Sequence, residues 1–409
     1  MLPPLDLSPV AFTVLMLAAT AAPMLLVDIL VFRVHRRPST GLDWSRKSDF
    51  SLRRTGVKLA GLAATFAVLA LGYWVFPEYK GNSYRLFFNL VREAWPYVVI
   101  PAAIYITVVD AYMVQPKDGY WQAGCLALGR FSEVDRKTMV QYCLGWLVKG
   151  YFIPYITPIL APDVRDVVNS AFVKGSTGFS PFYDFAYSLA FTIDVVFASL
   201  GYLMTLRVAD THIRTTEPTT MGWLVCIMCY PPFSKTFYAH YYSYESNTPY
   251  WGNWTSSVHP LFYWTWGMAI VVYLFFYAWT SITFGCRFSN LTNRGILTNG
   301  PFRLTKHPHY VFKNISWWLV VVPFVSKTTS LEAMRACLML AAFNFIYFMR
   351  ARTEERHLSQ DPAYVAYALW INDNGLFSWL GRILPFLRYK PPAGVKGDAD
   401  ILPHRRAVS

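Results

Sequence analysis

Eight apolar segments of this chain are long enough, or nearly so, to cross a lipid bilayer as helices. With a rise of 1.5 Å per residue, about 20 apolar residues span a hydrocarbon core of about 30 Å. Only 15% of the residues are charged, against about 25% in soluble domains. We therefore predict an all-α fold, a polytopic transmembrane bundle of about eight or nine spans, with candidates at Val10–Phe32, Gly56–Phe76, Trp95–Val114, Met139–Leu160, Tyr187–Leu206, Leu261–Phe284, Tyr310–Val325 and Leu331–Met349.

The last two apolar runs, Tyr310–Val325 and Leu331–Met349, are joined by five polar residues. Two helices connected in this way form a hairpin that returns the chain to the membrane face it left. The polar segment that precedes the hairpin should then meet Glu354 and Glu355, which follow it, although 44 residues separate Tyr310 from Glu354. This arrangement predicts a composite polar site at one membrane face.

The net charge of +13 comes from basic residues concentrated in short loops. Such clustering marks the cytoplasmic side of a membrane protein, so we expect no nucleic-acid partner. With the first loop inside, nine spans place the C-terminus inside if Met221–Tyr230 also crosses; because Pro231-Pro232 follows, this segment is alternatively a broken or re-entrant helix. The basic residues of the first loop are Arg33, Arg36, Arg37, Arg46, Lys47, Arg53, Arg54 and Lys58.

The chain has no Walker motif, GxGxxG motif or zincin motif, and its six cysteines are interpreted as core residues. We therefore expect no metal site. Three regions are predicted: an N-terminal transmembrane region at 1–215, a C-terminal region at 216–390 that carries the composite site, and a polar cytoplasmic tail at 391–409.

The segment from Gly300 to Tyr310 reads Gly-Pro-Phe-Arg-x-x-Lys-His-Pro-x-Tyr, and Glu354-Glu355 and Tyr364-x-x-Tyr367 follow the hairpin. This pattern resembles the isoprenylcysteine carboxyl methyltransferases and related phospholipid methyltransferases, which carry Arg-His-Pro-x-Tyr-x-Gly and a distal Glu-Glu. Members of that family are integral membrane enzymes that bind S-adenosylmethionine at the cytosolic face and methylate lipophilic acceptors. The resemblance covers roughly residues 260–390.

The resemblance implies a cofactor site for S-adenosylmethionine, with His307 and Tyr310 as candidate catalytic residues. Two positions depart from the family pattern. Lys306 replaces the motif arginine and loses its bidentate fork, and Phe312 replaces the motif glycine, where the backbone would otherwise approach the cofactor closely. The implied cofactor-binding residues are Gly300, Arg303, Lys306, His307, Pro308, Tyr310, Glu354 and Glu355.

The side chains of this segment also suit the cofactor on chemical grounds. S-adenosylmethionine needs carboxylates for its amine or ribose, cations for its carboxylate, and aromatic faces near its sulfonium. A hydroxyl, amine or thiol acceptor also requires a base, for which His307 or His309 is the nearest candidate. We expect a lipophilic small molecule or a lipidated molecule as acceptor, with membrane lipids as further partners.

Ionisable residues within or beside the apolar runs are candidate substrate contacts, because charges inside a membrane are costly. Asp194 lies centrally in its run, and Asp210 and His212 form a polar cluster with Glu217 after it. Two other classes of function stay open. One is an NADPH-dependent sterol or lipid reductase, whose C-terminal architecture is similar. The other is a non-catalytic lipid-binding or transport bundle, which the substitutions at Lys306 and Phe312 would fit.

Overall fold

The computed structural model describes residues 7–45, 47–241, 243–392 and 394 of the 409-residue chain. This part is almost entirely helical, which confirms the predicted all-α class. Its one sheet pairs two short antiparallel strands, β1 (Thr215–Thr216) and β2 (Thr292–Asn293), with Thr215 opposite Asn293.

The α-helices are α1 (Pro9–Leu26), α2 (Leu52–Val75), α3 (Arg85–Tyr112), α4 (Gly119–Ala127), α5 (Arg136–Asn169), α6 (Phe179–Leu203), α7 (Thr220–Ile227), α8 (Phe233–His240), α9 (Trp251–Val258), α10 (Pro260–Phe284), α11 (Pro308–Val321), α12 (Ser330–Leu358), α13 (Pro362–Asn374) and α14 (Ser378–Ile383). A π-helical turn, η1 (Val27–Val31), extends α1. Short 3₁₀ helices are η2 (Val34–Arg36), η3 (Pro38–Thr40), η4 (Pro77–Lys80), η5 (Asn82–Tyr84), η6 (Phe131–Glu133), η7 (Gly285–Arg287), η8 (Gly300–Arg303) and η9 (Pro385–Leu387).

Polar side chains fix where several of these helices begin. Ser51 caps α2 by accepting a hydrogen bond from the amide of Arg54, and Thr329 caps α12 by accepting one from the amide of Glu332. Asp361 caps α13 in the same way and is followed by a proline, whose missing N–H costs nothing in the first helical turn. The helix starts are therefore encoded locally.

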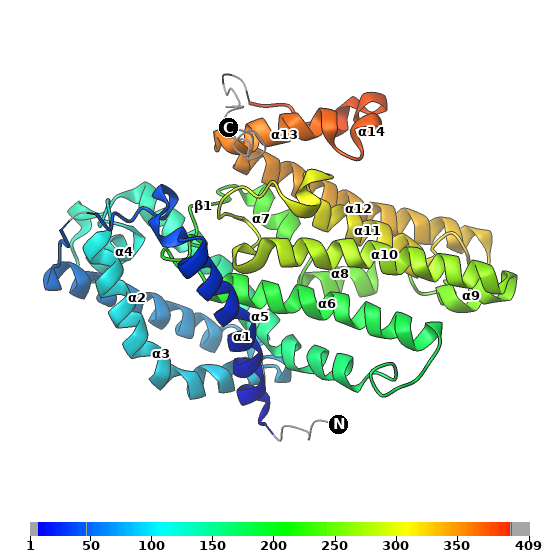
Figure 1. Ribbon diagram of the computed structural model, residues 1–409, viewed down its shortest axis with the longest axis horizontal. Coiled ribbons are helices and arrows are strands. Elements are labelled where there is room, and N and C mark those ends of the chain that lie inside the picture. The colour runs from blue at the N-terminus through cyan, green and yellow to red at the C-terminus, as the bar shows by residue number, and fades with distance from the viewer. Residues whose placement is uncertain (1–6, 46, 242, 393, 395–409) are drawn as a thin grey trace. The chain divides into compact units, whose positions relative to one another are not determined.

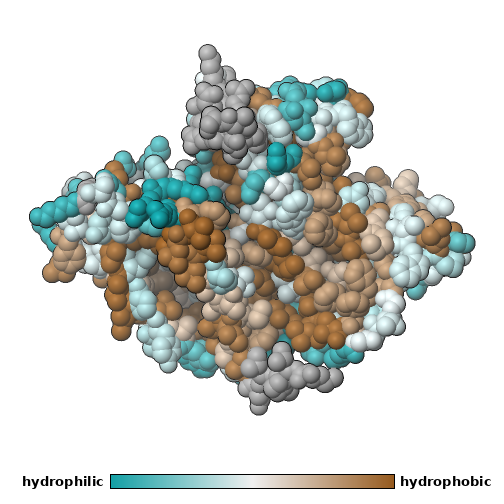
Figure 2. Space-filling model, in the orientation of Figure 1, coloured by the Kyte–Doolittle hydropathy of each residue, from teal (hydrophilic) through white to brown (hydrophobic). Residues whose placement is uncertain are grey.

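Seven helices in the described ranges are long and apolar enough to cross a membrane, and they coincide with seven of the predicted spans. Many apolar side chains on them are exposed: on α10 they recur every three or four residues and so form one stripe along the helix. Figure 2 shows apolar residues, in brown, over the long helices and hydrophilic ones at α13. These features indicate a membrane protein. The α10 stripe consists of Leu261, Trp264, Met268, Val272, Phe275, Trp279 and Ile282.

Two predicted spans form shorter helices than the sequence suggested. The run Tyr310–Val325 gives α11, which ends at Val321 after 14 residues, about 21 Å of helix. It ends there because Pro323 cannot continue a helix and disfavours helical backbone at the buried residue Val322, which adopts φ 50°. Likewise, the segment Met221–Tyr230 gives the eight-residue helix α7, and α8 begins only after the two prolines.

The chain forms two compact units that are interleaved along the sequence. The first unit comprises residues 1–162, 195–216 and 285–295, and the second unit comprises residues 163–194, 217–284 and 296–409. The predicted division into regions 1–215, 216–390 and 391–409 stays a prediction. Residues 395–409 of the predicted tail lie outside the described residues.

In the second unit, α10, α11 and α12 lie side by side (Figure 1). Asn344 on α12 accepts a hydrogen bond from Nε1 of Trp318 on α11 at 2.6 Å and donates one to Asn314. An apolar core that includes Trp251, Ile270 and Val322 packs α6, α9 and α10 against the end of α11. The contacts between α11 and α12 place the start of α11 beside the end of α12.

Candidate functional site

The loop before α11 is held in place by α13. The Tyr367 hydroxyl lies 2.7 Å from the carbonyl oxygen of Phe302 and 3.2 Å from that of Thr305. The amide of Leu376 donates to the carbonyl oxygen of Leu304 at 2.7 Å, and the Phe302 ring is buried in an apolar cluster with α13. Together these bonds fix the backbone that carries Lys306 and His307.

The start of α11 meets the end of α12 through polar contacts. Nζ of Lys306 lies 2.6 Å from Oε1 of Glu355, and the Tyr310 hydroxyl donates to Oε2 of Glu354 at 3.0 Å. The His307 ring has Nδ1 at 3.7 Å from Oε2 of Glu354 and Nε2 at 3.5 Å from Oε1 of Glu355. The structure thus brings together the segments 306–310 and 354–355, which lie more than 40 positions apart in the sequence.

The two neighbouring glutamates have different surroundings. Glu355 is buried, with 6% of its side chain exposed, and it also receives the Arg352 guanidinium at 2.8 Å. The Glu354 side chain is 39% exposed, and within the described ranges it contacts His307 and Tyr310. Glu355 is therefore neutralised by cations of the protein, whereas Glu354 presents a carboxylate to the outside. Glu354 is the better placed of the two to bind a cationic ligand.

Lys306 takes part in this site as an internal partner of Glu355. Burial lowers the pKa of Lys306, while the adjacent Glu355 carboxylate acts in the opposite direction. A lysine presents one point charge, and this one is aimed at a buried carboxylate. Lys306, which replaces the motif arginine, therefore forms an ion pair with Glu355 inside the protein.

Several buried polar atoms near the glutamates have no hydrogen-bond partner within the described ranges. Nζ of Lys306 and Nε2 of His307 are among them but lie within ion-pair distance of Glu355, whereas the hydroxyl oxygen of Tyr364 and Oε2 of Glu217 have no such contact. Burial and the carboxylates of Glu355 and Glu354 raise the pKa of Tyr364, so its hydroxyl stays a donor. The other carboxylate oxygen of Glu217 accepts from Thr219, and Arg356 lies 3.4 Å from it. Since unpaired buried polar atoms are costly, a donor and an acceptor left open here fit a polar ligand.

Arg350 adds a buried cation that the sequence did not single out. It lies one helical turn before Glu354, is 4% exposed, and places its guanidinium over the rings of Tyr230, Tyr310 and Tyr347 at 4.8–5.5 Å. Its sequence position after an apolar run suggested only a topology signal. Arg350 precedes Glu354 by four residues, a spacing that indicates a common helix face.

The remaining motif residues have mostly structural surroundings. Gly300 adopts φ 54°, and a side chain there would lie 2.9 Å from Oγ1 of Thr283. Pro308 is buried at the first position of α11, which suits its fixed backbone angle. Arg303 is exposed and makes no hydrogen bond or ion pair in the described ranges, so the structure does not bring it to the glutamates.

Phe312 stands where the family has glycine, and its ring is buried. It stacks on Phe276 of α10, with ring centroids 4.9 Å apart and an angle of 21° between the ring planes. The position therefore serves the packing of α11 on α10, and no backbone is exposed for a ligand there.

Asp194 is joined to the motif segment through His309. Its carboxylate accepts hydrogen bonds from the hydroxyls of Tyr277 at 2.6 Å and Ser281 at 2.7 Å, and Nε2 of His309 lies 3.7 Å away. Lys313, one turn after His309, lies over the Tyr277 ring at 5.4 Å. These residues form a polar network across α6, α10 and α11, and the substrate role of Asp194 stays a prediction.

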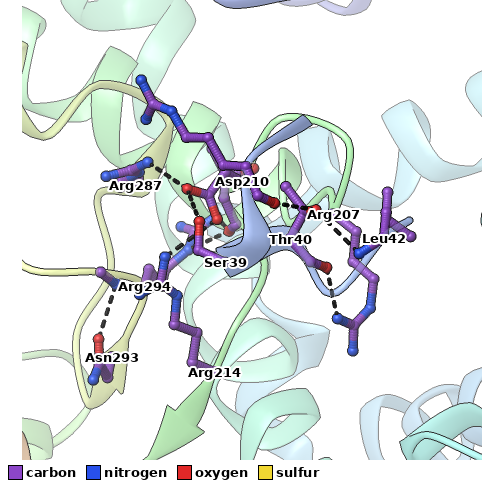
Figure 3. Close-up of polar contacts among 12 residues, drawn as sticks. Ser39, Thr40, Leu42, Arg207, Asp210, Arg214, Arg287, Asn293 and Arg294 are labelled. Carbon is purple, nitrogen blue, oxygen red and sulfur yellow. Dashed lines mark hydrogen bonds and ion pairs between the residues drawn. The ribbon is translucent and has the colours of Figure 1, made fainter. Parts of the chain in front are cut away.

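Asp210 and His212 belong to the first unit. The Asp210 carboxylate accepts from Ser39 at 2.8 Å, Arg287 at 3.1 Å and Arg214 at 3.2 Å (Figure 3). Burial and four neighbouring arginines lower the pKa of His212 to about 3. These two residues are thus part of a charged cluster within their own unit, and their role in substrate binding stays a prediction.

Comparisons of the chain with protein-family models, with curated proteins and with solved structures find no match.

Proposed function

We propose that this protein is an integral membrane methyltransferase that uses S-adenosylmethionine and acts on a lipophilic acceptor. The observation that carries the proposal is the contact between two motif segments, in which Lys306, His307 and Tyr310 lie within 4 Å of the carboxylates of Glu354 and Glu355. A partly exposed glutamate beside buried charged side chains and aromatic rings suits the amine and the sulfonium of this cofactor.

The residues fit the functional groups of S-adenosylmethionine. Glu354 and the open oxygen of Glu217 would accept hydrogen bonds from its amine or ribose, and the Tyr364 hydroxyl would donate to its carboxylate. The Tyr310 and Tyr347 rings, which Arg350 holds, supply aromatic surface near the same turn of α12. When bound, the cofactor supplies a methyl group that leaves its sulfur, which keeps the bonding electron pair, and forms a bond to the acceptor.

His307 and Tyr310 act in this proposal mainly by positioning. Both ring nitrogens of His307 face carboxylate oxygens, and its ring lies parallel to that of Tyr310, with 4° between the planes. The Tyr310 hydroxyl donates a hydrogen bond to Glu354. For methyl transfer the protein must chiefly align acceptor and methyl and exclude water, and this rigid pairing serves alignment.

A lipophilic acceptor is favoured because apolar surface adjoins the motif segment. The helix α10 packs against both η8 and α11 and exposes an apolar stripe along its length. An acceptor dissolved in the bilayer reaches such a helix laterally. The cytosolic placement of the cofactor site rests on the predicted topology, in which the basic loops lie at the cytoplasmic side and nine spans bring the C-terminus to that side.

A binding titration tests the class of function. We expect full-length protein purified in detergent to bind S-adenosylmethionine but not NADPH, and we expect Glu354→Gln to weaken binding about tenfold, as the loss of one charge-assisted hydrogen bond implies. Glu133→Gln is the matched control, since Glu133 is an exposed glutamate of the first unit. Binding of NADPH alone would instead support a reductase, and binding of neither would support a non-catalytic bundle.

The acceptor class needs a second experiment. The protein is incubated with a membrane lipid extract and S-adenosylmethionine carrying a labelled methyl group, and the label should enter products that partition into organic solvent. Efficient labelling of water-soluble acceptors alone would refute the lipophilic class and leave the cofactor assignment standing.

A further inference from the structure

The first unit contains a cluster of arginines around Asp210 that the proposed function does not use. Segments that are far apart in sequence meet there: the turn at Ser39, the loop 204–214, and the segment 285–295 (Figure 3). Arg214 and Arg287 each bond one oxygen of the Asp210 carboxylate, at 3.2 and 3.1 Å. The cluster is therefore assembled by the tertiary fold.

Positive charge exceeds negative charge in this cluster. Arg207, Arg214, Arg287 and Arg294 all act electrostatically on His212, and Arg37 acts on Arg287. The acidic groups that face Arg287 are Asp210 and Asp28. Among these described groups, five arginines face two aspartates, so the cluster carries an excess of positive charge.

The excess charge lies in partly buried side chains. Arg294 is 3% exposed, and in the part of the chain that the structure describes it donates only to backbone carbonyl oxygens, including those of Gly201 at 2.6 Å and Phe288 at 2.9 Å. Burial lowers its pKa to about 9, which still leaves it charged at neutral pH. The Arg214 and Arg287 side chains are 29% and 21% exposed. Arginines that only orient a protein in the membrane can lie fully in water. Partly buried arginines that lie close together repel one another, and this repulsion favours binding of an anion.

Unpaired polar nitrogen atoms border the same place. Nε of Arg214 and Nδ1 of His212 are buried and have no hydrogen-bond partner within the described ranges. Gly295 adopts φ 100°, and a Cβ there would lie 3.1 Å from Nη2 of Arg214 and 3.4 Å from Nη1 of Arg287. Two guanidinium groups thus converge on a position that glycine keeps free of a side chain.

The cluster lies where membrane-length helices end. The candidate spans Pro9–Val31 and Phe179–Leu203 end shortly before Arg37 and Arg207, and the span Pro260–Arg287 ends at Arg287 itself. Helix ends of candidate spans lie at the level of lipid headgroups. Basic sites at this depth, between spans on the cytoplasmic side, suit anionic headgroups.

We propose that Arg214, Arg287 and Arg37 bind the phosphate group of an anionic membrane lipid beside Gly295. Guanidinium groups match phosphate oxygens in pairs, and phosphate is the anionic group that a membrane presents at this depth. Asp210 holds the two bonded arginines in position and leaves their remaining N–H groups for the ligand. A soluble phosphate offers the same chemistry, so the test must separate the two sources.

The experiment measures binding and thermal stability of delipidated full-length protein in detergent. Phosphatidic acid is the probe, phosphatidylcholine is the zwitterionic control, and inorganic phosphate is the soluble control. We expect phosphatidic acid to raise the melting temperature saturably, and Arg214→Gln or Arg287→Gln to weaken its binding about tenfold each. Arg53→Gln, which removes an exposed arginine in the first turn of α2, should leave binding unchanged.

Arg37→Gln keeps the proposal testable if the first two variants do not fold, because Arg37 is exposed and donates no side-chain hydrogen bond in the described ranges. It should weaken binding several-fold. Equal stabilisation of the wild type, Arg37→Gln and Arg53→Gln would overturn the site, as would equal effects of phosphatidic acid and phosphatidylcholine. Protection by inorganic phosphate as strong as that by lipid would support a phosphate site and overturn its lipid source.

Discussion

The substitution Glu355→Gln removes a buried negative charge that lies close to three basic side chains. Its carboxylate lies 2.6 Å from Nζ of Lys306, 2.8 Å from Nη1 of Arg352 and 3.5 Å from Nε2 of His307. Glutamine has nearly the same shape and keeps one oxygen as an acceptor. The substitution therefore tests the charge itself.

The expected loss follows from the burial of each partner. Breaking a fully buried ion pair by removing one charge costs about 3–5 kcal/mol. The Lys306 and Glu355 side chains are 11% and 6% exposed, so this pair is close to that limit, whereas Arg352 is 37% exposed and is screened by water. We expect Glu355→Gln to lower the free energy of unfolding by about 3 kcal/mol, at the lower end of the range because an acceptor oxygen remains.

Removing both charges should restore part of the loss. Lys306→Met takes away the cation that Glu355→Gln leaves unpaired, so the double variant should lose about 2 kcal/mol less than the sum of the single variants. Equilibrium unfolding in mixed micelles, followed by tryptophan fluorescence, measures each free energy. The pair Glu133→Gln and Lys137→Met provides the control, since both residues are exposed, and it should show no measurable coupling.

Additive effects of Glu355→Gln and Lys306→Met would refute the reasoning. So would a loss from Glu355→Gln no larger than that from Glu133→Gln, because a solvated carboxylate behaves in that way. Either result would mean that the two side chains do not form a buried pair in solution.

Three further changes have defined outcomes. Tyr310→Phe removes the hydroxyl bonded to Glu354 and should weaken S-adenosylmethionine binding by roughly tenfold in a calorimetric titration; unchanged affinity would count against the site. Gly295→Ala should lower the melting temperature more than Gly129→Ala, because both glycines have positive φ but only the former has neighbours within 4 Å; equal losses would mean that crowding is negligible. The pKa of His212 is lowered from 6.5 to about 3, so the unfolded chain binds a proton in that window that the folded chain excludes. As the pH is lowered from 6.5 toward 3, the free energy of unfolding should therefore decrease, by at most about 1.4 kcal/mol per pH unit. The same slope in His212→Gln would contradict this.

The sequence alone predicted the features that depend on local pattern. Runs of about 20 apolar residues mark the long helices, because hydrophobic length is a property of the segment itself. The caps at Ser51 and Thr329, which the structure shows, are also local features of the chain, although they were not singled out from the sequence. The sequence also predicted that the motif segment meets Glu354, and the structure has the Tyr310 hydroxyl 3.0 Å from Oε2 of Glu354; the hairpin of two full spans stays a prediction.

Two further features had a sequence signal that the predictions above did not use. The interpretation of Tyr310–Val325 as one helix passed over Pro323, which ends α11 at Val321. Arg350 was not singled out from the sequence, although its spacing of four residues from Glu354 indicated a common helix face. In both cases the signal was a single residue within a longer apolar pattern.

The different surroundings of Glu354 and Glu355 were decided by the tertiary structure alone. Adjacent glutamates are equivalent in sequence, and only the packing of Lys306 and Arg352 around one of them buries its charge and leaves the other exposed. The arginine cluster at Asp210 is likewise built from segments up to about 250 residues apart. Burial and unpaired donors depend on which distant elements pack together, whereas helix length and capping depend on neighbours along the chain.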